Sequence, residues 1–400
     1  MTIRIKKYNS STAGDNPSQE IINLLWYSII ITDIVRKITR VEWSVSLIRN
    51  GLYVLVFLYV LWHAFKKRNI AQILLPGVGF ALLLGISVLL YPEVSVLVEE
   101  NVLLFYGRCL TGFYLALNIK DWRKVLSSLA SWHWIGFLYA IIVFSVGLDM
   151  TENYMSFSYG LLLPAFITVA DGILEKKILR VFSGSVMTIA IFTFGARGPL
   201  LCIAVGLIFM IFEIPNGRIN YRRFIALGLL IVLVILFASS FDNIFLYLYQ
   251  RFPHARNILL IISGQMNSLS GRDALFNKAV EVIKINPVLP RGLLADRIIL
   301  GSHNISANVY PHNFFLEIII QFGFLGWLFS AWLIYKVLRT YYQILKSGNK
   351  ILKIAFVSFF ITALAKSMFT GSYVSDMQCW FAFGCLISIS NSQNRTELSA

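Results

Sequence analysis

Residues 70–91 read IAQILLPGVGFALLLGISVLLY and contain no charged side chain. A helix needs about 20 apolar residues to cross the hydrocarbon core of a bilayer, which is about 30 Å thick, and this stretch is long enough. The rest of the chain has the same character, since 57% of its 400 residues are hydrophobic and only 14% are charged. Soluble domains contain about 45–50% apolar and about 25% charged residues. The composition therefore excludes a soluble multidomain enzyme, a disordered protein and a disulfide scaffold.

Apolar runs of similar length recur along the whole chain. None shows a strand alternation long enough for a barrel, and a helix is the remaining way to satisfy the backbone in lipid. We predict an all-α polytopic membrane protein, a single integral membrane domain of residues 1–400 with about twelve transmembrane helices. Residues 1–20 lack the apolar core of a signal peptide, so the first run is expected to stay as an anchor. The predicted spans are 21–35, 46–65, 70–91, 102–119, 127–148, 155–172, 179–195, 198–214, 224–240, 313–335, 351–369 and 378–391.

The distribution of Lys and Arg predicts the orientation. A net charge of +15 suggests nucleic-acid binding in a soluble protein, but membrane proteins collect basic residues in their cytoplasmic loops. With both termini inside, the external loops 92–101, 149–154 and 370–377 contain no Lys or Arg, only acids. The inner loops then hold the basic residues Lys66, Lys67, Arg68, Lys120, Arg123, Lys124, Lys176, Lys177, Arg180, Arg218, Arg222, Arg223, Lys336, Arg339, Lys346, Lys350 and Lys353.

Four basic residues near the first two spans disagree with this orientation: Arg36, Lys37, Arg40 and Arg49. Either the first span is interfacial, or these side chains have a role at the outer surface. Two further charged residues, Lys366 and Asp33, lie near span ends, where snorkelling or pairing is the simpler interpretation. Three tryptophans are expected in the interfacial aromatic belts: Trp26, Trp43 and Trp62.

The segment 241–312 is predicted to be one large periplasmic or extracytoplasmic loop between spans nine and ten. It far exceeds usual connection lengths, and long loops are usually functional or disordered. Its composition indicates order, because Ser270-Gly271-Arg272-Asp273 is typical of a helix start and Asn286-Pro287 of a helix stop. Seven basic residues against four acids are unusual for an external loop.

The stretch from Tyr310 to Gly326 contains the strongest candidate for chemistry. It reads YPHNFFLEIIIQFGFLG, so that His312-Asn313 is followed by nine residues and then by Gly323-x-x-Gly326. By topology, His312 lies where the large external loop enters the tenth span, and an imidazole there suits a catalytic base. The two glycines allow another helix to approach closely. A histidine that merely anchors a helix end is the simpler alternative.

This pattern resembles that of the O-antigen ligase and polymerase superfamily, in which His-(Asn/Ser/Gln)-x9-Gly-x-x-(Gly/Thr/Tyr) follows the large periplasmic loop. Two further elements are similar: the turn Phe194-Gly195-Ala196-Arg197-Gly198 between two spans, and Ser270-Gly271-Arg272 at a loop helix. The resemblance covers roughly residues 190–330, and the N-terminal half matches only in hydropathy. The paired Arg-x10-Gly and Arg-x15-Gly spacings of some polymerases are absent, so that variant of the mechanism does not transfer.

The resemblance implies metal-independent inverting glycosyl transfer on a GT-C-like helical fold, without a cofactor. The donor would be an oligosaccharide linked to undecaprenyl diphosphate. His312 would then act as the base, and Arg197 and Arg272 would bind the diphosphate, because a guanidinium pairs bidentately with phosphate oxygens. The remaining candidates for binding diphosphate or glycan are Arg108, Arg291, Asn313 and Glu317.

Each of these candidates also has a simpler interpretation. An external arginine at a helix start can snorkel to lipid headgroups, and Pro290-Arg291-Gly292 can be a plain loop turn. Arg108 and Glu317 lie inside predicted spans, where ionisable residues are costly and often functional, but Arg108 can also form an internal salt bridge. No metal site or disulfide is predicted, because the four cysteines lie in apolar stretches without a C-x-x-C pair: Cys109, Cys202, Cys379 and Cys385.

Three functions remain open from the sequence. The favoured one is a repeat-unit polymerase for O-antigen or capsular polysaccharide, and the closest alternative is an O-antigen ligase that transfers the glycan to lipid A-core. A polysaccharide transporter or flippase is the alternative of another class, but no matching halves of the kind found in transporters are evident. The expected partners are the lipid-linked donor and the bilayer, with a chain-length regulator as a further candidate and no nucleic acid. The expected location is the bacterial inner membrane, with the active site on the periplasmic face.

Overall fold

The computed structural model describes residues 17–39, 42–148, 154–194, 197–211, 250, 272–301, 309–368 and 370–398, and the side chains of Arg197 and Arg272 are outside this description. Every element in these ranges is a helix. The first half contains α1 (Gln19–Thr39), α2 (Glu42–Lys66), α3 (Ala71–Leu90), η1 (Pro92–Leu97), α4 (Val98–Leu104), η2 (Phe105–Cys109), α5 (Leu110–Leu117), α6 (Trp122–Ser131), α7 (His133–Val146), α8 (Tyr154–Leu174), α9 (Ile178–Phe194) and α10 (Arg197–Ile211). The second half contains α14 (Arg272–Ile285), α15 (Ala295–Gly301), α16 (Phe314–Phe322), α17 (Phe324–Ser347), α18 (Lys350–Phe356), η5 (Val357–Ile361), α19 (Thr362–Ser367) and α20 (Met377–Leu398).

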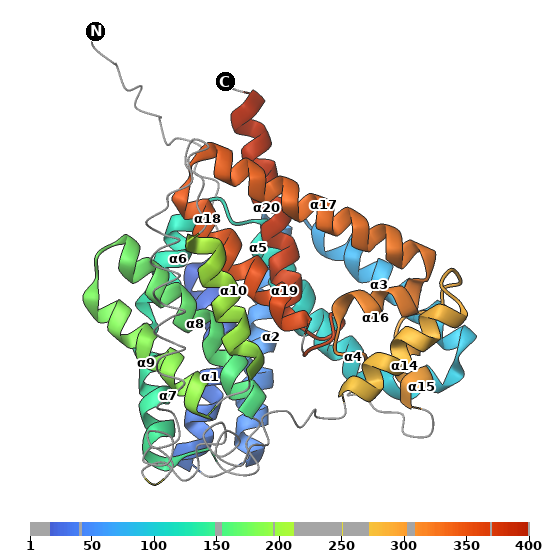
Figure 1. Cartoon of the computed structure of the whole chain (residues 1–400), viewed down its shortest axis with the longest axis horizontal. Helices are drawn as coiled ribbons and strands as arrows, with labels where there is room; N and C mark the ends of the chain where they lie inside the picture. The colour runs from blue at the N-terminus through green and yellow to red at the C-terminus, as the bar shows by residue number, and fades with distance from the viewer. Residues whose placement is uncertain are drawn as a thin grey trace, which may run out of the picture.

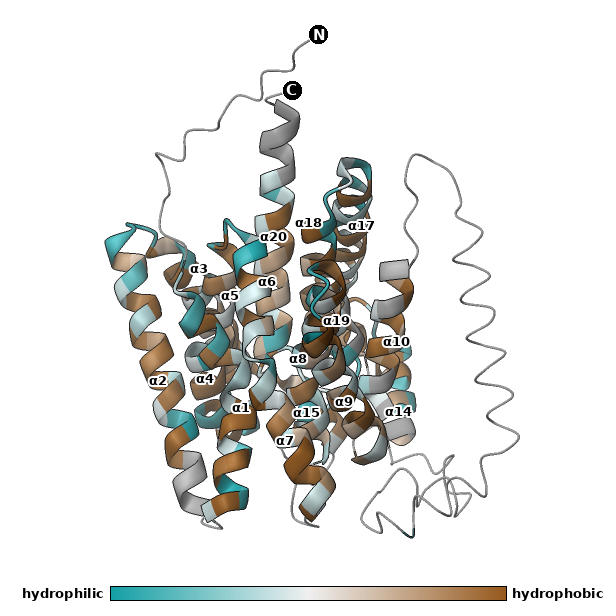
Figure 2. Ribbon diagram, turned by 90° about the vertical axis from the view of Figure 1, so that its left-hand side faces the viewer, coloured by the Kyte–Doolittle hydropathy of each residue, from teal (hydrophilic) through white to brown (hydrophobic). Residues whose placement is uncertain are grey.

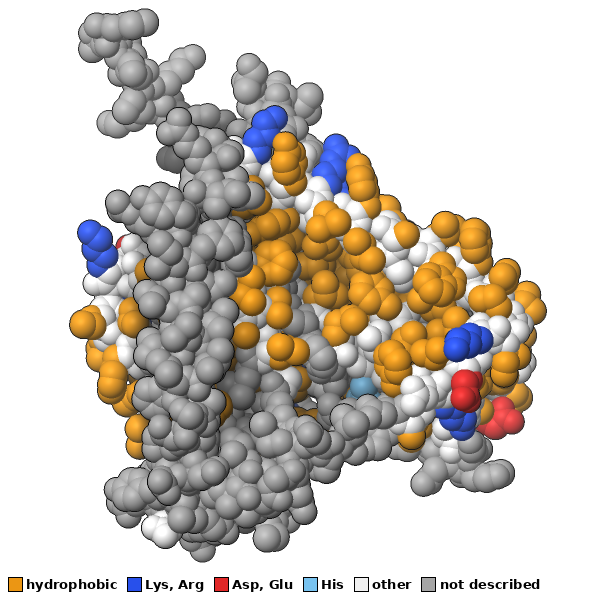
Figure 3. Space-filling view, in the orientation of Figure 1, with side chains coloured by type: hydrophobic (Ala, Val, Ile, Leu, Met, Phe, Trp, Pro, Cys, Tyr) orange, Lys and Arg blue, Asp and Glu red, His pale blue; other side chains and the backbone are white. Residues whose placement is uncertain are grey.

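The helices have the lengths and surfaces of a membrane protein. Four described helical stretches are long and apolar enough to cross a membrane: Leu47–Lys66, Ala71–Leu90, Trp122–Val146 and Tyr154–Leu174. Large apolar side chains remain on the outside, among them Leu75 and Leu89 of α3. Apolar side chains cover much of the described surface in Figure 3, with Lys and Arg near its edges, and the helices are mainly apolar along their length (Figure 2). Lipid is the solvent that tolerates such a surface.

α8 is the central helix of the bundle. Its span is 83% buried inside the protein, compared with 28% for the span in α3. It packs against α1, α6, α7, α9 and α10, which surround it in Figure 1. Small residues permit the closest of these contacts: a Cβ on Gly184 of α9 would lie 2.6 Å from Val169 of α8. Close approach through small residues is the usual basis of helix packing in membranes.

Two of the four basic residues that disagree with the predicted orientation have local partners among the described residues. Lys37, near the end of α1, donates a hydrogen bond to the Gly147 carbonyl at the C-terminus of α7 (2.9 Å), where a cation is favoured by the helix dipole. Arg36 pairs with Asp33 one turn earlier (3.2 Å), which confirms the expected pairing of Asp33. These contacts explain why α1 ends with two cations.

The tenth predicted span, 313–335, is wrong as a single helix. It divides at Gly323 into α16 and α17, which diverge in Figure 1. Gly323 has a φ of +54°, and a Cβ there would lie 2.2 Å from the Val288 carbonyl oxygen. A Cβ on Gly326 would lie 2.5 Å from the Ile318 oxygen of α16. The two glycines therefore permit close approach, as predicted, but to a loop and to the preceding helix.

The described residues of the segment 241–312 include two helices, α14 and α15. The helix predicted to start at Ser270-Gly271-Arg272-Asp273 and to stop at Asn286-Pro287 corresponds to α14, whose described residues are Arg272–Ile285, whereas the short α15 was not predicted. α14, α15 and α16 lie together below α3 and α17 in Figure 1. Lys278 of α14 donates a hydrogen bond to the Leu300 carbonyl at the end of α15 (2.9 Å). The ninth predicted span, 224–240, lies outside the described residues.

One aromatic prediction is wrong. Trp26 is only 4% exposed, and its ring packs edge-on against Phe381 and tilted against Phe359. It is a core residue, not a belt residue. Trp62, in contrast, is 57% exposed on α2.

Replacing Gly326 by Ala is expected to lower the free energy of unfolding by about 1–3 kcal/mol, because the new methyl group overlaps the backbone of α16. Gly85→Ala is the matched control, since no atom lies within 4 Å of its Cβ position. Thermal unfolding of both variants in detergent tests this. Equal midpoints would contradict the close approach.

Candidate functional site

A cavity of about 850 Å³ gathers polar side chains from four distant parts of the chain. We call it the His312 cavity. Its walls come from η2, the first turns of α8, the segment before α16, and the end of α19 with the loop that follows it. The lining residues are Ile29, Arg108, Tyr154, Met155, Ser156, Tyr159, Gly160, Leu275, Tyr310, His312, Lys366, Thr370, Gly371, Ser375, Asp376 and Gln378.

His312 is half-buried in this wall and is held in an unusual backbone conformation. Its φ is +53°, a region that costs a non-glycine residue of order 1–3 kcal/mol and persists only when the surroundings impose it. The next residue, Asn313, begins α16, and its side-chain oxygen accepts hydrogen bonds from the backbone N–H groups of Phe315 and Leu316 (both 3.1 Å). The imidazole lies against the ring of Tyr310, with 4.1 Å between the ring centroids.

Arg108 and Lys366 are the two cations among the described lining residues, and Asp376 is the one acid. Arg108 lies in the π-helical turn η2, a distortion that is frequent at functional sites. Its guanidinium packs over the Tyr53 ring (4.8 Å), and its buried Nε has no hydrogen-bond partner among the described residues. Lys366 pairs with Asp376 (2.9 Å), which confirms the expectation that Lys366 is paired.

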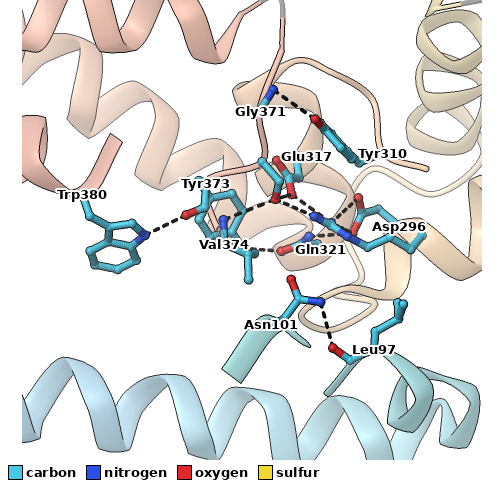
Figure 4. A network of polar contacts seen from close by, with 12 residues as sticks. Leu97, Asn101, Asp296, Tyr310, Glu317, Gln321, Gly371, Tyr373, Val374 and Trp380 are labelled. Atoms are coloured by element: carbon cyan, nitrogen blue, oxygen red, sulfur yellow. Dashed lines mark hydrogen bonds and ion pairs between the residues drawn. The ribbon is translucent and has the colours of Figure 1, made fainter. Parts of the chain in front are cut away.

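A buried ionic cluster joins α15, α16 and the loop before α20 (Figure 4). At its centre is Arg297 of α15, which is 1% exposed. One terminal nitrogen contacts the carboxylates of Asp296 (2.7 Å) and Glu317 (2.8 Å), and the other donates to the hydroxyl of Ser372. Ser372 in turn donates to Glu317, so the loop before α20 is bonded to both α15 and α16.

The cluster continues through neutral groups. Gln321 donates to Asp296 (2.6 Å) and accepts from the Tyr373 hydroxyl. Trp380 of α20 donates to the Tyr373 carbonyl (2.7 Å), as Figure 4 shows. Burial raises the pKa of the Tyr373 phenol well above its ordinary value, so this hydroxyl remains a donor at physiological pH.

Tyr310 joins the cavity to the cluster. Its ring faces the Arg297 guanidinium (5.4 Å), and its hydroxyl accepts a hydrogen bond from the Gly371 N–H (3.0 Å). Burial raises the pKa of this phenol, and the nearby Glu317 acts in the same direction. The ring is therefore neutral at physiological pH.

Of the residues proposed from the sequence, the structure brings His312 and Arg108 into the cavity. Glu317 instead lies in the ionic cluster, where it is fully buried. Asn313 caps α16, and Arg291 donates to the Val282 carbonyl near the end of α14 (3.0 Å). These contacts give Glu317, Asn313 and Arg291 structural roles in this conformation.

The other two arginines are placed only by their backbones. Arg197 begins α10 and Arg272 begins α14. α14 reaches the cavity through Leu275, one turn after Arg272, and α10 packs against α19, which carries Lys366.

Sequence reasoning missed Lys366, Asp376 and Tyr310 as cavity residues. A lysine in an apolar run is a signal of function, and Asp376 follows it by ten residues, at the start of α20. No local pattern marks Arg297, because its partner Ser372 lies 75 residues away. Among the described residues, no group of three or more His, Cys, Asp or Glu side chains gathers to hold a metal ion.

Residues 182–331 match the Wzy_C family model, described as O-antigen ligase. This match supports the O-antigen ligase/polymerase superfamily, whose members are glycosyltransferase-like enzymes. It includes His312, Arg197, Arg272 and the cluster residue Arg297, whereas Arg108 and Lys366 lie outside it. No curated protein and no solved structure shows significant similarity to the chain.

Replacing Arg297 by Met is expected to lower the free energy of unfolding by about 3–5 kcal/mol, because it leaves two buried carboxylates without their cation. Arg123→Met removes the exposed ion pair with Glu175 and should cost no more than about 1 kcal/mol. Thermal unfolding in detergent compares the two. A similar loss of stability in both variants would show that burial does not determine how much the Arg297 contacts contribute to the free energy of unfolding.

Proposed function

We propose that the protein is a membrane glycosyltransferase that polymerises lipid-linked oligosaccharide repeat units of an O-antigen or capsular polysaccharide. It transfers the growing glycan from undecaprenyl diphosphate to a new lipid-linked unit, on a GT-C-like helical scaffold. The observation that carries this proposal is the His312 cavity, which is lined by the His312 imidazole together with Arg108 and Lys366. The family match of the segment that contains His312 supports the reaction class.

The chemistry follows from this arrangement. The acceptor hydroxyl gives its proton to the His312 imidazole as its oxygen attacks the anomeric carbon. The bond from that carbon to the phosphate oxygen breaks on the opposite face, so the configuration inverts. The diphosphate leaves with the bonding electron pair, and positioned cations stabilise the negative charge that develops on it.

The cavity suits an anionic donor. Its one acid, Asp376, is paired with Lys366, whereas the guanidinium of Arg108 has no carboxylate partner among the described residues. Arg197 and Arg272 are proposed as further diphosphate ligands, since each begins a helix and helix N-termini favour phosphate.

The proposed orientation puts this cavity on the outer face of the inner membrane. Its walls include Tyr154, the segment 310–312 and the loop 370–376, and the positive-inside rule assigns all three to the outside. Both termini are then cytoplasmic. A donor glycan exposed on the periplasmic side would meet His312 without crossing the membrane.

An apolar groove offers a place for the polyprenyl chain. It has a volume of about 450 Å³ and only apolar lining, and it lies between α10, α17 and α19. Phe315, three residues after His312, and Met368, two residues before Thr370, belong to its wall. A lipid tail in this groove would leave its diphosphate near the cavity.

An O-antigen ligase is the second candidate, because the matching family model carries that description. The same residues would serve it, with a lipid A-core sugar as the acceptor. The polymerase is preferred because Ser270-Gly271-Arg272 leads into the amphipathic α14, an arrangement that resembles repeat-unit polymerases.

Deleting the gene distinguishes these functions by the surface glycan that remains. Loss of a polymerase should leave single repeat units on the final acceptor, because transfer of one unit still proceeds. Loss of a ligase should leave none. Electrophoresis of the extracted glycolipid measures this, with complementation as the control. An unchanged polymer would contradict both enzymes.

His312→Ala is expected to abolish polymer while protein amount and membrane insertion stay normal, because the base is lost. His133→Ala is the matched control: this imidazole bonds Ser183 on α9 (3.0 Å) and is not among the cavity residues, so polymer should persist. Complementation of the deletion strain and glycan electrophoresis provide the measurement. Normal polymer from the His312 variant would refute the base assignment.

A further inference from the structure

Tyr310 occupies a distinctive place between a fixed cation and the proposed base. One ring contact joins it to the Arg297 guanidinium (5.4 Å) and another to the His312 imidazole (4.1 Å between centroids). It is 9% exposed and lines the cavity. Tyr310 thus connects the buried ionic cluster to the part of the cavity wall that carries His312.

The Arg297 side of this arrangement is immobilised. The guanidinium is bonded to Asp296, Glu317 and Ser372, which come from two helices and a separate loop. An arginine held by charge-assisted bonds from several elements has little freedom to move. The Tyr310 ring faces this guanidinium (5.4 Å) and its hydroxyl is bonded to the Gly371 N–H, so the position of the ring is fixed as well.

The His312 side needs such support. The backbone of His312 is in the left-handed region, and this conformation persists only where neighbouring groups impose it. Asn313 fixes the start of α16 through its capping bonds, but these bonds do not orient the imidazole. The Tyr310 ring lies directly against it.

We infer that Tyr310 is a positioning residue that transmits the geometry of the Arg297 cluster to the His312 imidazole. The inference rests on the proposed function, since it assumes that His312 takes a proton from the acceptor. The ring carries this role through its flat surface. The hydroxyl contributes only an anchor to the loop that contains Gly371.

A positioning role differs from simple space filling in the kind of side chain that it requires. An aromatic ring is needed at position 310, so Tyr310→Phe should retain the function and Tyr310→Leu should lose it. The turnover number should fall while the donor KM changes little, because the cations proposed to bind the diphosphate are other residues. A 1 Å displacement of a catalytic group can cost about 100-fold in rate.

The assay uses purified full-length protein and lipid-linked glycan extracted from cells that lack the gene. We expect kcat to fall about 30-fold to 100-fold in Tyr310→Leu, because a small displacement of a catalytic group can cost about 100-fold in rate. Tyr310→Phe should stay within about threefold of the wild type, with KM changed less than about threefold in both. His312→Ala is run in parallel.

Tyr139→Leu is the matched control for loss of a buried tyrosine. Tyr139 likewise has a hydroxyl contact, to Asp33 (3.1 Å), and a close ring contact, with Phe157 (5.3 Å), but it is not among the residues that line the cavity. It should lower thermal stability and leave kcat of the folded fraction unchanged. Tyr310→Met replaces Tyr310→Leu if the latter does not yield folded protein, because Met fills irregular space well.

The outcomes separate the inference from the proposed function. Wild-type kcat in the folded Leu or Met variant, with an inactive His312→Ala, overturns the inference and leaves the function standing. Equal loss of kcat in the Phe variant overturns it too, since the ring alone would be insufficient. Full activity of His312→Ala overturns the proposed mechanism and the inference together.

Discussion

The arrangement of α15, α16 and the loop before α20 depends on the buried guanidinium of Arg297. In an apolar interior a single unpaired charge is very costly, so a buried cation must keep its carboxylates and its hydroxyl partner together. Here those partners come from α15, α16 and the loop before α20. Their relative positions are therefore set by electrostatics as well as by packing. The loop before α20 also lines the His312 cavity, through Thr370, Gly371, Ser375 and Asp376.

Hydropathy and helix signals predicted much of this fold because both are local. The start and stop of α14 followed from Arg272 and Asn286, and most spans correspond to described helices. The break at Gly323 was missed because it depends on the approach of the Val288 carbonyl. In an apolar run, nothing in the local sequence distinguishes a glycine inside a helix from one at its end.

The candidate site was predictable only in part, because some of its residues are paired across long distances in the sequence. His312 was found because its motif is local, and Arg108 because a charge in an apolar run is conspicuous. Glu317 was recognised for the same reason, but its partner Arg297 places it in the cluster. The contact between Tyr310 and Gly371 spans 61 residues. Only the tertiary structure reveals pairings of that range.

The basic residues that the predicted topology places outside the membrane divide into two kinds. Lys37, Lys278 and Arg291 donate to carbonyls at or near helix ends, and Arg297 neutralises a buried cluster. These four residues serve the scaffold. Arg108 differs from them, because it lines the cavity and its Nε has no described partner.

The cavity brings together residues inside and outside the segment that matches the family model. His312 lies in the segment that matches the family model, whereas Arg108, Lys366 and Asp376 lie outside it. The two parts are connected beside the cavity by the bonds of Gly371 to Tyr310 and of Ser372 to Arg297 and Glu317. A base and the cations that hold its substrate must keep a fixed separation for transfer to proceed. On the proposed mechanism, the Ser372 bonds of this loop therefore help to hold His312 and Lys366 at a fixed separation.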